Sequence, residues 1–246
     1  MPGLATGAVP GQRVFADLHC HTSASFDSLA SPAAVVRAAA ARGLTHLAIT
    51  DHERIDGALA GRDAAPPELT VIVGQEVRSQ GGDLIGLYLA RPVAPGMPAL
   101  DTVQAIREQG GVVGLPHPFD RFRSSGARWN AGGDWHALLE LVDYVEAYNA
   151  RVMVGDGNLR AAELAHDAGL PAVAATDAHT LMEVGVAYTI LHGDLSSAAG
   201  LRAALAAGTE LVTGRASRLV RLGMPISKGV QWLRGNRRIQ PTPARG

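Results

Sequence analysis

Short apolar segments that end in histidine or carboxylate side chains recur along this chain, and they limit its fold more than any other feature. The apolar segments span 14–19, 46–50, 69–74, 83–89, 111–116, 144–148, 172–176 and 186–191. Segments with helical spacing lie between many of them, at 32–42, 100–109, 135–142, 158–168 and 196–207. This alternation predicts an α/β fold in which crossover helices join parallel strands. The length of 246 residues suits one β/α barrel.

Polar residues stand at the end of most of these segments. They are His19 and His21, Asp51 and His52, Glu76, His117, Glu146 and Asn149, and Asp177 and His179. In a parallel barrel the carboxyl ends of all strands open on one face, so side chains that are far apart in the sequence meet there. The sequence therefore predicts one polar site at the C-terminal ends of the strands.

The motif DLHCHTS (17–23) places the only cysteine of the chain between two histidines. Successive side chains of a strand point to opposite faces, so His19 and His21 share one face and Cys20 lies on the other. Two imidazoles on one face at a strand end suit a metal ion, and Cys20 is expected in the core. A single cysteine also excludes an intrachain disulfide.

Imidazole and carboxylate groups at the strand ends are too many for one tetrahedral ion. The predicted ligands are His19, His21, Asp27, His52, Glu76, His117, Asp177 and His179. Zinc, manganese and iron accept this mixture of donors, so we expect two or three divalent ions and hydrolytic chemistry. Asp51 is expected to orient an imidazole rather than to bind metal. The other four histidines, His46, His136, His166 and His192, are expected to have structural roles rather than to bind metal.

Charge is distributed unevenly along the chain. Residues 1–214 hold 23 acidic residues and 14 arginines, a net charge of −9, whereas residues 215–246 hold seven arginines and Lys228, a net charge of +8. Such a tail docks on the acidic body, contacts nucleic acid or stays solvated, and its Pro and Gly content favours the solvated state. We expect a flexible segment at 1–12, one domain at 13–224 and a basic tail at 225–246.

Targeting segments are not evident in the sequence. The first 13 residues lack the basic and apolar regions of a signal peptide, and no run approaches the ~18 apolar residues of a membrane span. We therefore expect a cytoplasmic protein that does not contact a membrane.

Six motifs, taken in order, resemble those of one family. They are DLHCHTSASFDSLASP (17–32), LAITDHERIDG (47–57), GQEV (74–77), GLPHPFDR (114–121), VEAYNAR (145–151) and TDAHTLMEVG (176–185). Together they resemble the polymerase and histidinol phosphatase superfamily, or PHP domain, over roughly residues 13–192. The resemblance implies a distorted seven-stranded β/α barrel that holds up to three divalent ions at the C-terminal ends of its strands, usually manganese, zinc or iron.

The resemblance also implies how the ligands divide among three ions. His19, His21, Glu76 and Asp177 would hold the first ion, and Glu76 would bridge to a second ion bound by His117. Asp27, His52 and His179 would hold the third. Asp83 stands where many relatives have a histidine, so it is a further expected ligand, with a weak or empty second site as the alternative.

Family members that are not modules of a DNA polymerase resemble phosphatases or phosphodiesterases. We expect a metal-bridging hydroxide to attack the phosphorus of a phosphomonoester or phosphodiester. The substrate would be a phosphorylated small molecule, a nucleotide or an RNA or DNA end, and contact of the basic tail with nucleic acid is the alternative to a solvated tail. Arg121, Arg123 and Arg151 are expected to bind phosphate oxygens.

Two alternatives remain open from the sequence. An amidohydrolase-type barrel also begins with a His-x-His pair and cleaves C–N bonds, but many such sites use a carboxylated lysine. The only lysine here is Lys228, in the basic tail. The second alternative is a non-catalytic module that binds metal and a nucleotide.

Overall fold

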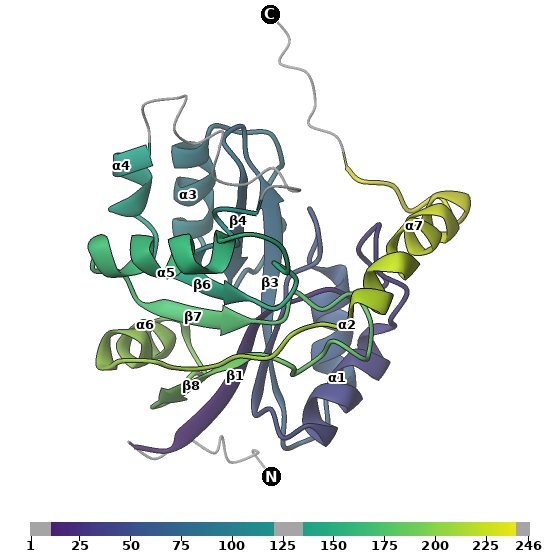
Figure 1. Ribbon diagram of the computed structural model, residues 1–246, viewed down its shortest axis with the longest axis horizontal. Helices are drawn as coiled ribbons and strands as arrows, with labels where there is room; N and C mark the ends of the chain where they lie inside the picture. The colour runs from purple at the N-terminus through teal and green to yellow at the C-terminus, as the bar shows by residue number, and fades with distance from the viewer. Residues whose placement is uncertain (1–10, 121–134, 240–246) are drawn as a thin grey trace, which may run out of the picture.

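The computed structural model describes residues 11–120 and 135–239 (Figure 1). Its strands are β1 (Arg13–Cys20), β2 (His46–Ile49), β3 (Thr70–Arg78), β4 (Asp83–Leu87), β5 (Val112–Leu115), β6 (Tyr144–Asn149), β7 (Ala172–Ala175), β8 (Tyr188–His192) and β9 (Glu210–Val212). Its helices are α1 (Pro32–Ala41), α2 (Asp56–Ala64), α3 (Ala99–Arg107), α4 (Trp135–Leu139), α5 (Gly157–Asp167), α6 (Ala198–Ala207) and α7 (Arg218–Leu233). Each expected strand and helix has a counterpart here, whereas α2, β9 and α7 were not expected.

The strands form one mixed sheet that nearly closes into a barrel. The strand order is β7-β6-β5-β4-β3-β2-β1-β8-β9. Just after β7, Ala178 forms a parallel bridge with Cys20 at the end of β1, and the Asp177 amide donates to the His19 carbonyl over 2.8 Å. These bonds bring the ends of β1 and β7 together, so the histidine pair lies at the closure of the barrel.

The expected number and direction of strands were partly wrong. The described residues hold nine strands rather than seven, because β8 pairs antiparallel with β1 and β9 pairs antiparallel with β8. The strands are also not all parallel, since β4 runs antiparallel to both β3 and β5. Residues 79–82 are too few for the crossover that a parallel neighbour requires, so the chain turns directly from β3 into β4.

Two apolar clusters stabilise the barrel. One takes at least one side chain from each of β1 to β8 and fills the interior together with leucines of α6. The fully buried Tyr144 ring belongs to it, and a Cβ at Gly114 would lie 2.2 Å from that ring, so β5 needs glycine there. The other cluster packs helices such as α1 and α3 against the sheet.

In the described residues up to 239, the C-terminal part of the chain forms a helix and contacts the barrel, although many of its side chains are exposed. Helix α7 runs through position 225, so the expected boundary between domain and tail falls inside a helix that contains Pro225. Figure 1 shows α7 on the same side of the molecule as α1 and α2. Beyond it, Asn236 and Arg238 contact residues of the barrel. None of the helices in the described ranges is long and apolar enough to cross a membrane.

Candidate metal centre

The histidine pair at the end of β1 has the arrangement that the strand periodicity predicts. His19 and His21 are fully buried on one face, and their Nε2 atoms lie 2.9 Å apart. Cys20 is buried in the apolar cluster between the sheet and the helices. The expected core position of the cysteine is therefore confirmed.

Eight of the nine expected metal ligands come together at the C-terminal ends of the strands. They form three groups, and within each group the possible ligand atoms lie within 4.8 Å of one another. The groups are His19, His21 and Glu76; His19, His117 and Asp177; and His21, Asp27, His52 and His179, which we call the Asp27 group. Because His19 and His21 each belong to two groups, the three groups form one connected cluster.

Glu76 lies at the centre of this cluster. Its Oε2 is 3.2 Å from His21 Nε2 and 3.3 Å from His52 Nδ1, and its Oε1 is 3.2 Å from His117 Nε2. His19 Nε2 also lies 3.4 Å from Oε2. Burial alone would raise the pKa of this carboxyl group, but His52 and His19 hold it well below its usual value. One ionised carboxylate thus faces imidazoles from four positions in the sequence.

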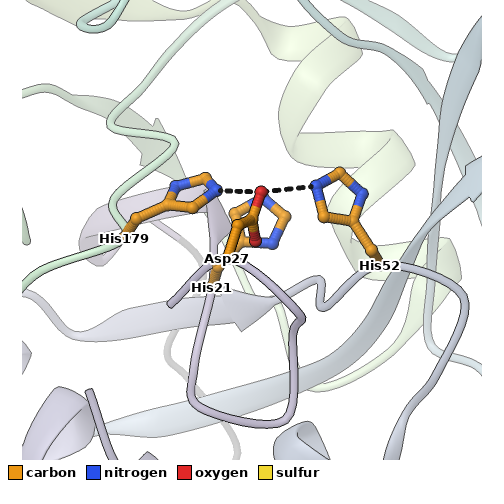
Figure 2. Close-up of side chains that lie close together, drawn as sticks. All are labelled: His21, Asp27, His52 and His179. Carbon is orange, nitrogen blue, oxygen red and sulfur yellow. Dashed lines mark ion pairs between the residues drawn. The ribbon is translucent and has the colours of Figure 1, made fainter. Parts of the chain in front are cut away.

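The Asp27 group surrounds a carboxylate that comes from a loop rather than from a strand. Figure 2 shows Asp27 between His52 and His179, with the ring of His21 behind it. Asp27 Oδ2 lies 3.4 Å from His52 Nε2 and 3.2 Å from His179 Nε2. Burial opposes ionisation of Asp27, yet His179 and His52 hold its pKa well below its usual value. We call residues 22–30 the Asp27 loop.

The donor set fits divalent ions. Imidazole and carboxylate donors together suit zinc, manganese or iron. In addition, the buried Nδ1 atoms of His21 and His117 have no hydrogen-bond partner among the described residues. A buried polar atom without a partner is costly, and metal ligation is one way to satisfy it.

Protonation states show what a metal ion would displace. Burial disfavours imidazolium, but Glu146 and Glu76 raise the pKa of His19 to about 10. In the same way burial opposes protonation of His52, while Glu76 and Asp27 raise its pKa to about 9. The metal-free site therefore carries two imidazolium groups at neutral pH, and their protons must leave before these nitrogens can bind an ion.

Glu146 supports the cluster from behind, a role that was not predicted. Its Oε1 lies 2.6 Å from His19 Nδ1. Its Oε2 accepts from the His117 backbone amide over 3.1 Å and from Asn149 Nδ2 over 3.0 Å. These bonds fix the ring of His19 so that Nε2 faces the cluster, as carboxylates behind metal-binding histidines commonly do. The sequence predicted that Glu146 lies at a strand end, but it did not predict the contact with His19.

The backbone is strained at two of the expected ligands. His117 and Asp177 have positive φ angles, of 28° and 53°. Residues other than glycine rarely adopt this region, at a cost of about 1–3 kcal/mol each, and such positions concentrate at functional sites. The strain places both side chains at the cluster where β5 and β7 end.

In the part of the chain that the structure describes, both carboxylate oxygens of Asp51 bond to Thr22 and no hydrogen bond to an imidazole is found, so the expected orienting role of Asp51 is not seen. Its Oδ1 accepts from the Thr22 amide over 2.6 Å and its Oδ2 accepts from the Thr22 hydroxyl over 2.7 Å. Asp51 thereby fixes the start of the Asp27 loop. A Cβ at Gly57 would lie 2.0 Å from Asp51 Oδ2, so the approach of α2 to this carboxylate requires glycine.

Asp83 is the expected ligand that joins none of the three groups found among the described residues. Its Oδ1 lies 3.4 Å from Nη2 of Arg238. The same nitrogen lies 3.2 Å from Oε1 of Glu53. A guanidinium group from the C-terminal segment therefore lies where a further cation was expected beside Asp83.

The three expected phosphate-binding arginines have different outcomes. Arg121 and Arg123 lie outside the described residues. Arg151 is fully buried: its Nη1 donates to the Asp177 carbonyl over 3.3 Å and its Nε lies 3.6 Å from Glu183 Oε1. In this position Arg151 supports the backbone at Asp177, and substrate contact stays a prediction.

Comparison with known proteins agrees with this geometry. The family model described as the PHP domain matches residues 17–148, and the model described as PHP-associated matches residues 155–210. An uncharacterized protein of Methanocaldococcus jannaschii is 32% identical over 173 residues, which cover 70% of this chain and 68% of the relative.

Two solved structures are similar in fold. A two-domain protein of Bacteroides vulgatus, which contains a predicted PHP-like metal-dependent phosphoesterase, has a TM-score of 0.68 at 19% identity, covering 85% of this chain and 68% of that one. The lesion-specific endonuclease Q of Pyrococcus furiosus has a TM-score of 0.60 at 15% identity, covering 81% and 58%. Because the PHP model spans more than half of the sequence and includes six of the eight clustered residues, the chain belongs to the PHP domain family.

Proposed function

We propose that this protein is a metal-dependent phosphoesterase that hydrolyses a phosphomonoester or a phosphodiester. The observation that carries the proposal is the connected cluster around Glu76, which gathers four histidines within 3.4 Å of one carboxylate. Two or three divalent ions held there, manganese, zinc or iron, would supply a hydroxide nucleophile at neutral pH and neutralise charge on the phosphoryl oxygens.

The protein's own residues would have three tasks in this reaction. The strand-end histidines and carboxylates hold the ions close together. Glu146 keeps the His19 ring oriented, and Arg151 supports the backbone at Asp177. Arg121 and Arg123 follow the His117 segment in the sequence and are proposed to bind phosphate oxygens through their planar guanidinium groups.

A nucleotide or nucleic-acid end is the substrate class that we favour. Endonuclease Q, a similar fold, has been solved with a DNA duplex that carries an abasic lesion at its active site. The C-terminal segment of this chain exposes Lys228, Arg234 and Arg237, and basic side chains at a surface attract phosphate backbones. Both observations support a polyanionic substrate, and small phosphoesters are the alternative.

The test uses full-length protein that is depleted of metal and then loaded with manganese, iron or zinc. Hydrolysis is measured on an aryl phosphomonoester, an aryl phosphodiester and 5′-phosphorylated RNA and DNA oligonucleotides. We expect metal-dependent release of phosphate or nucleotide, and His19→Ala should lower the rate by roughly 10²–10³-fold or more, as when one group that stabilises a transition state is lost. Full activity in chelator would contradict the proposal.

A panel of amides and lactones separates the two alternatives in the same assay. Turnover of the panel without turnover of phosphoesters would favour an amidohydrolase. Binding of metal and nucleotide without turnover of any substrate would favour a non-catalytic module.

A further inference from the structure

Gln231 and Asn236, near the end of the chain, hydrogen-bond to the Asp27 loop, and we call the segment 231–238 that holds them the C-terminal clamp. Gln231, on α7, has a buried side chain although it stands in a polar, basic part of the sequence. Its Nε2 donates to the carbonyl of Ser23 over 2.8 Å, to that of Ser25 over 3.0 Å and to that of Ser28 over 2.5 Å. An amide NH₂ has two hydrogens, so the three carbonyls share them.

Asn236 makes a second set of contacts with the same loop. Its Nδ2 lies 3.2 Å from the carbonyl oxygen of Ser23, 3.0 Å from that of Ala24 and 3.2 Å from that of Ser25, and donates to them. Its Oδ1 accepts from Arg54 Nη1 over 3.3 Å. Two side-chain amides from the end of the chain thus satisfy backbone carbonyls of a loop more than 200 positions earlier.

The loop residues that the clamp binds also contact the metal cluster. The hydroxyl of Ser25, whose carbonyl accepts from Gln231, donates to Asp27 Oδ1 over 2.8 Å. The hydroxyl of Ser28 donates to the His179 carbonyl over 2.8 Å. Ser25 therefore links the clamp to Asp27, and Ser28 links the clamp to His179.

Aromatic contacts join the same parts of the molecule. The ring of Phe26, next to Asp27 in the loop, lies 5.0 Å from the His52 ring between centroids. The charged groups of Lys228 and Arg238 lie 5.6 Å and 5.4 Å from the centroid of Phe26, within the range of cation–π attraction. Contacts from α7 and from the residues after it thus meet on the side chain that flanks Asp27.

The Asp27 loop has no helix or strand between β1 and α1 to hold it. Without the clamp the carbonyls of Ser23, Ser25 and Ser28 would lose their amide donors, and Ser25, which bonds to Asp27, would be held less firmly. We propose that the C-terminal clamp positions Asp27 for metal binding, so that docking of the clamp and binding of an ion by the Asp27 group are coupled. The inference rests on the proposed function only in that this group binds a divalent ion. Coupling of this kind is reciprocal: the clamp strengthens metal binding by the same factor as metal strengthens docking of the clamp.

The experiment measures metal binding to the full-length, metal-depleted protein without substrate. Gln231→Met and Asn236→Ala remove the amide donors and leave the charge of the site unchanged. Arg237→Ala is the control, because Arg237 is exposed, its guanidinium stacks on Trp232, and no hydrogen bond from it to the loop is found among the described residues. Manganese affinity is measured by calorimetry, and bound metal is counted after equilibrium dialysis.

We expect each clamp variant to bind one ion about tenfold more weakly, as loss of hydrogen bonds with a net value near 1.4 kcal/mol implies. The remaining ions should keep the affinity of the wild type, and Arg237→Ala should match the wild type. Unchanged affinity for every ion in both clamp variants would overturn the inference. Equal weakening of all ions, together with a lower melting temperature of the metal-free protein, would overturn it as well, because a general loss of stability would then explain the result.

The reciprocal measurement needs no variant. Hydrogen exchange of residues 231–238 in the wild type should slow when manganese is added, and unchanged exchange with metal bound would overturn the coupling. A protein that binds no metal at all would instead contradict the proposed function. The two failures are therefore distinguishable.

Discussion

The strand-end cluster and the C-terminal segment are neighbours in the molecule, but they leave very different traces in the sequence. Every ligand of the cluster except Asp27 stands at or near the end of an apolar run, so its place follows from local periodicity and from the rule that parallel strands end on one face. The clamp contacts backbone carbonyls, which every residue has, and therefore no residue type in the loop predicts it. A site built from metal-binding side chains can therefore be predicted from the sequence, whereas hydrogen bonds to backbone carbonyls cannot.

The largest effect is expected at the centre of the cluster. Glu76→Gln removes the charge that faces four histidines, so the affinity for more than one ion should fall by more than about 100-fold, beyond the range for a residue that only orients a ligand. Calorimetry and metal counting measure this loss. Glu68→Gln is the matched control, since Glu68 is exposed and stands just before the start of β3, whereas Glu76 lies near its end. Wild-type metal content in Glu76→Gln would break the assignment of Glu76 as the shared carboxylate.

A smaller effect is expected behind the cluster. Glu146→Gln keeps the size of the side chain but weakens its hold on His19 Nδ1, and we expect metal affinity to fall by about 10–100-fold. The exposed Glu140 supplies the control variant Glu140→Gln. If Glu146→Gln instead weakened binding as strongly as Glu76→Gln, Glu146 would itself be a ligand rather than a support.

Metal affinity should also rise with pH. His19 and His52, with pKa values of about 10 and about 9 in the metal-free site, hold protons that an ion must displace. Each proton displaced should change the affinity by about tenfold per pH unit in the range below these pKa values. Calorimetry at pH 7 in two buffers of different ionisation enthalpy counts the protons, and we expect about two. Binding without proton release would contradict this account of the site.

Arg238 gives the smallest predicted effect, and it concerns stability. Burial and the neighbouring Glu76 raise the pKa of Asp83, and burial raises that of Glu53, although Arg238 opposes both shifts. A carboxyl group whose pKa is raised by folding stabilises the folded state at low pH and destabilises it as pH rises through that pKa. Arg238→Met removes the compensating charge, so unfolding at neutral pH should need about 1–3 kcal/mol less free energy than in the wild type.

Denaturant titration at several pH values tests this prediction. The deficit of Arg238→Met should shrink as the pH falls through the raised pKa values of Glu53 and Asp83, because a protonated carboxyl group no longer needs the positive charge of Arg238. Arg237→Met, next to it in the sequence and exposed, should stay within about 0.5 kcal/mol of the wild type. A deficit that does not depend on pH would show that packing on Phe26, rather than charge, explains the effect of Arg238.

Much of the fold was predictable because apolar runs and helical spacing are local. The same reasoning failed where local signals are weak or point the wrong way. Helix α7 contains Gly223, Pro225 and Gly229, which are typical of a loose tail, and its stability comes from tertiary contacts such as those of Gln231. Helix α2 contains two glycines and begins without a side-chain cap, since Ile55 stands at its N-cap position. The antiparallel turn from β3 into β4 depends on a short connection, not on the strands themselves.

The candidate metal centre also has features that the sequence predicted and features that it did not. Eight expected ligands lie in the cluster, and seven of them stand at or near a strand end, whereas Asp27 comes from the loop after β1. Asp83 also stands at a strand, but its partner is Arg238, 155 positions later, and nothing near Asp83 in the sequence reveals that contact. Asp51 was assigned to an imidazole because His52 follows it, whereas its carboxylate turns to Thr22 on the neighbouring loop. Strand ends predict where a side chain lies, and tertiary packing decides what it contacts.

The most direct test of the shared cluster is anomalous diffraction from crystals of the manganese-loaded protein. We predict manganese peaks within coordination distance, about 2–2.5 Å, of His19, Glu76 and Asp177, with Glu76 contacting more than one ion and Asp83 still paired with Arg238. Ions bound elsewhere, or a Glu76 carboxylate that contacts none of them, would contradict the central claim.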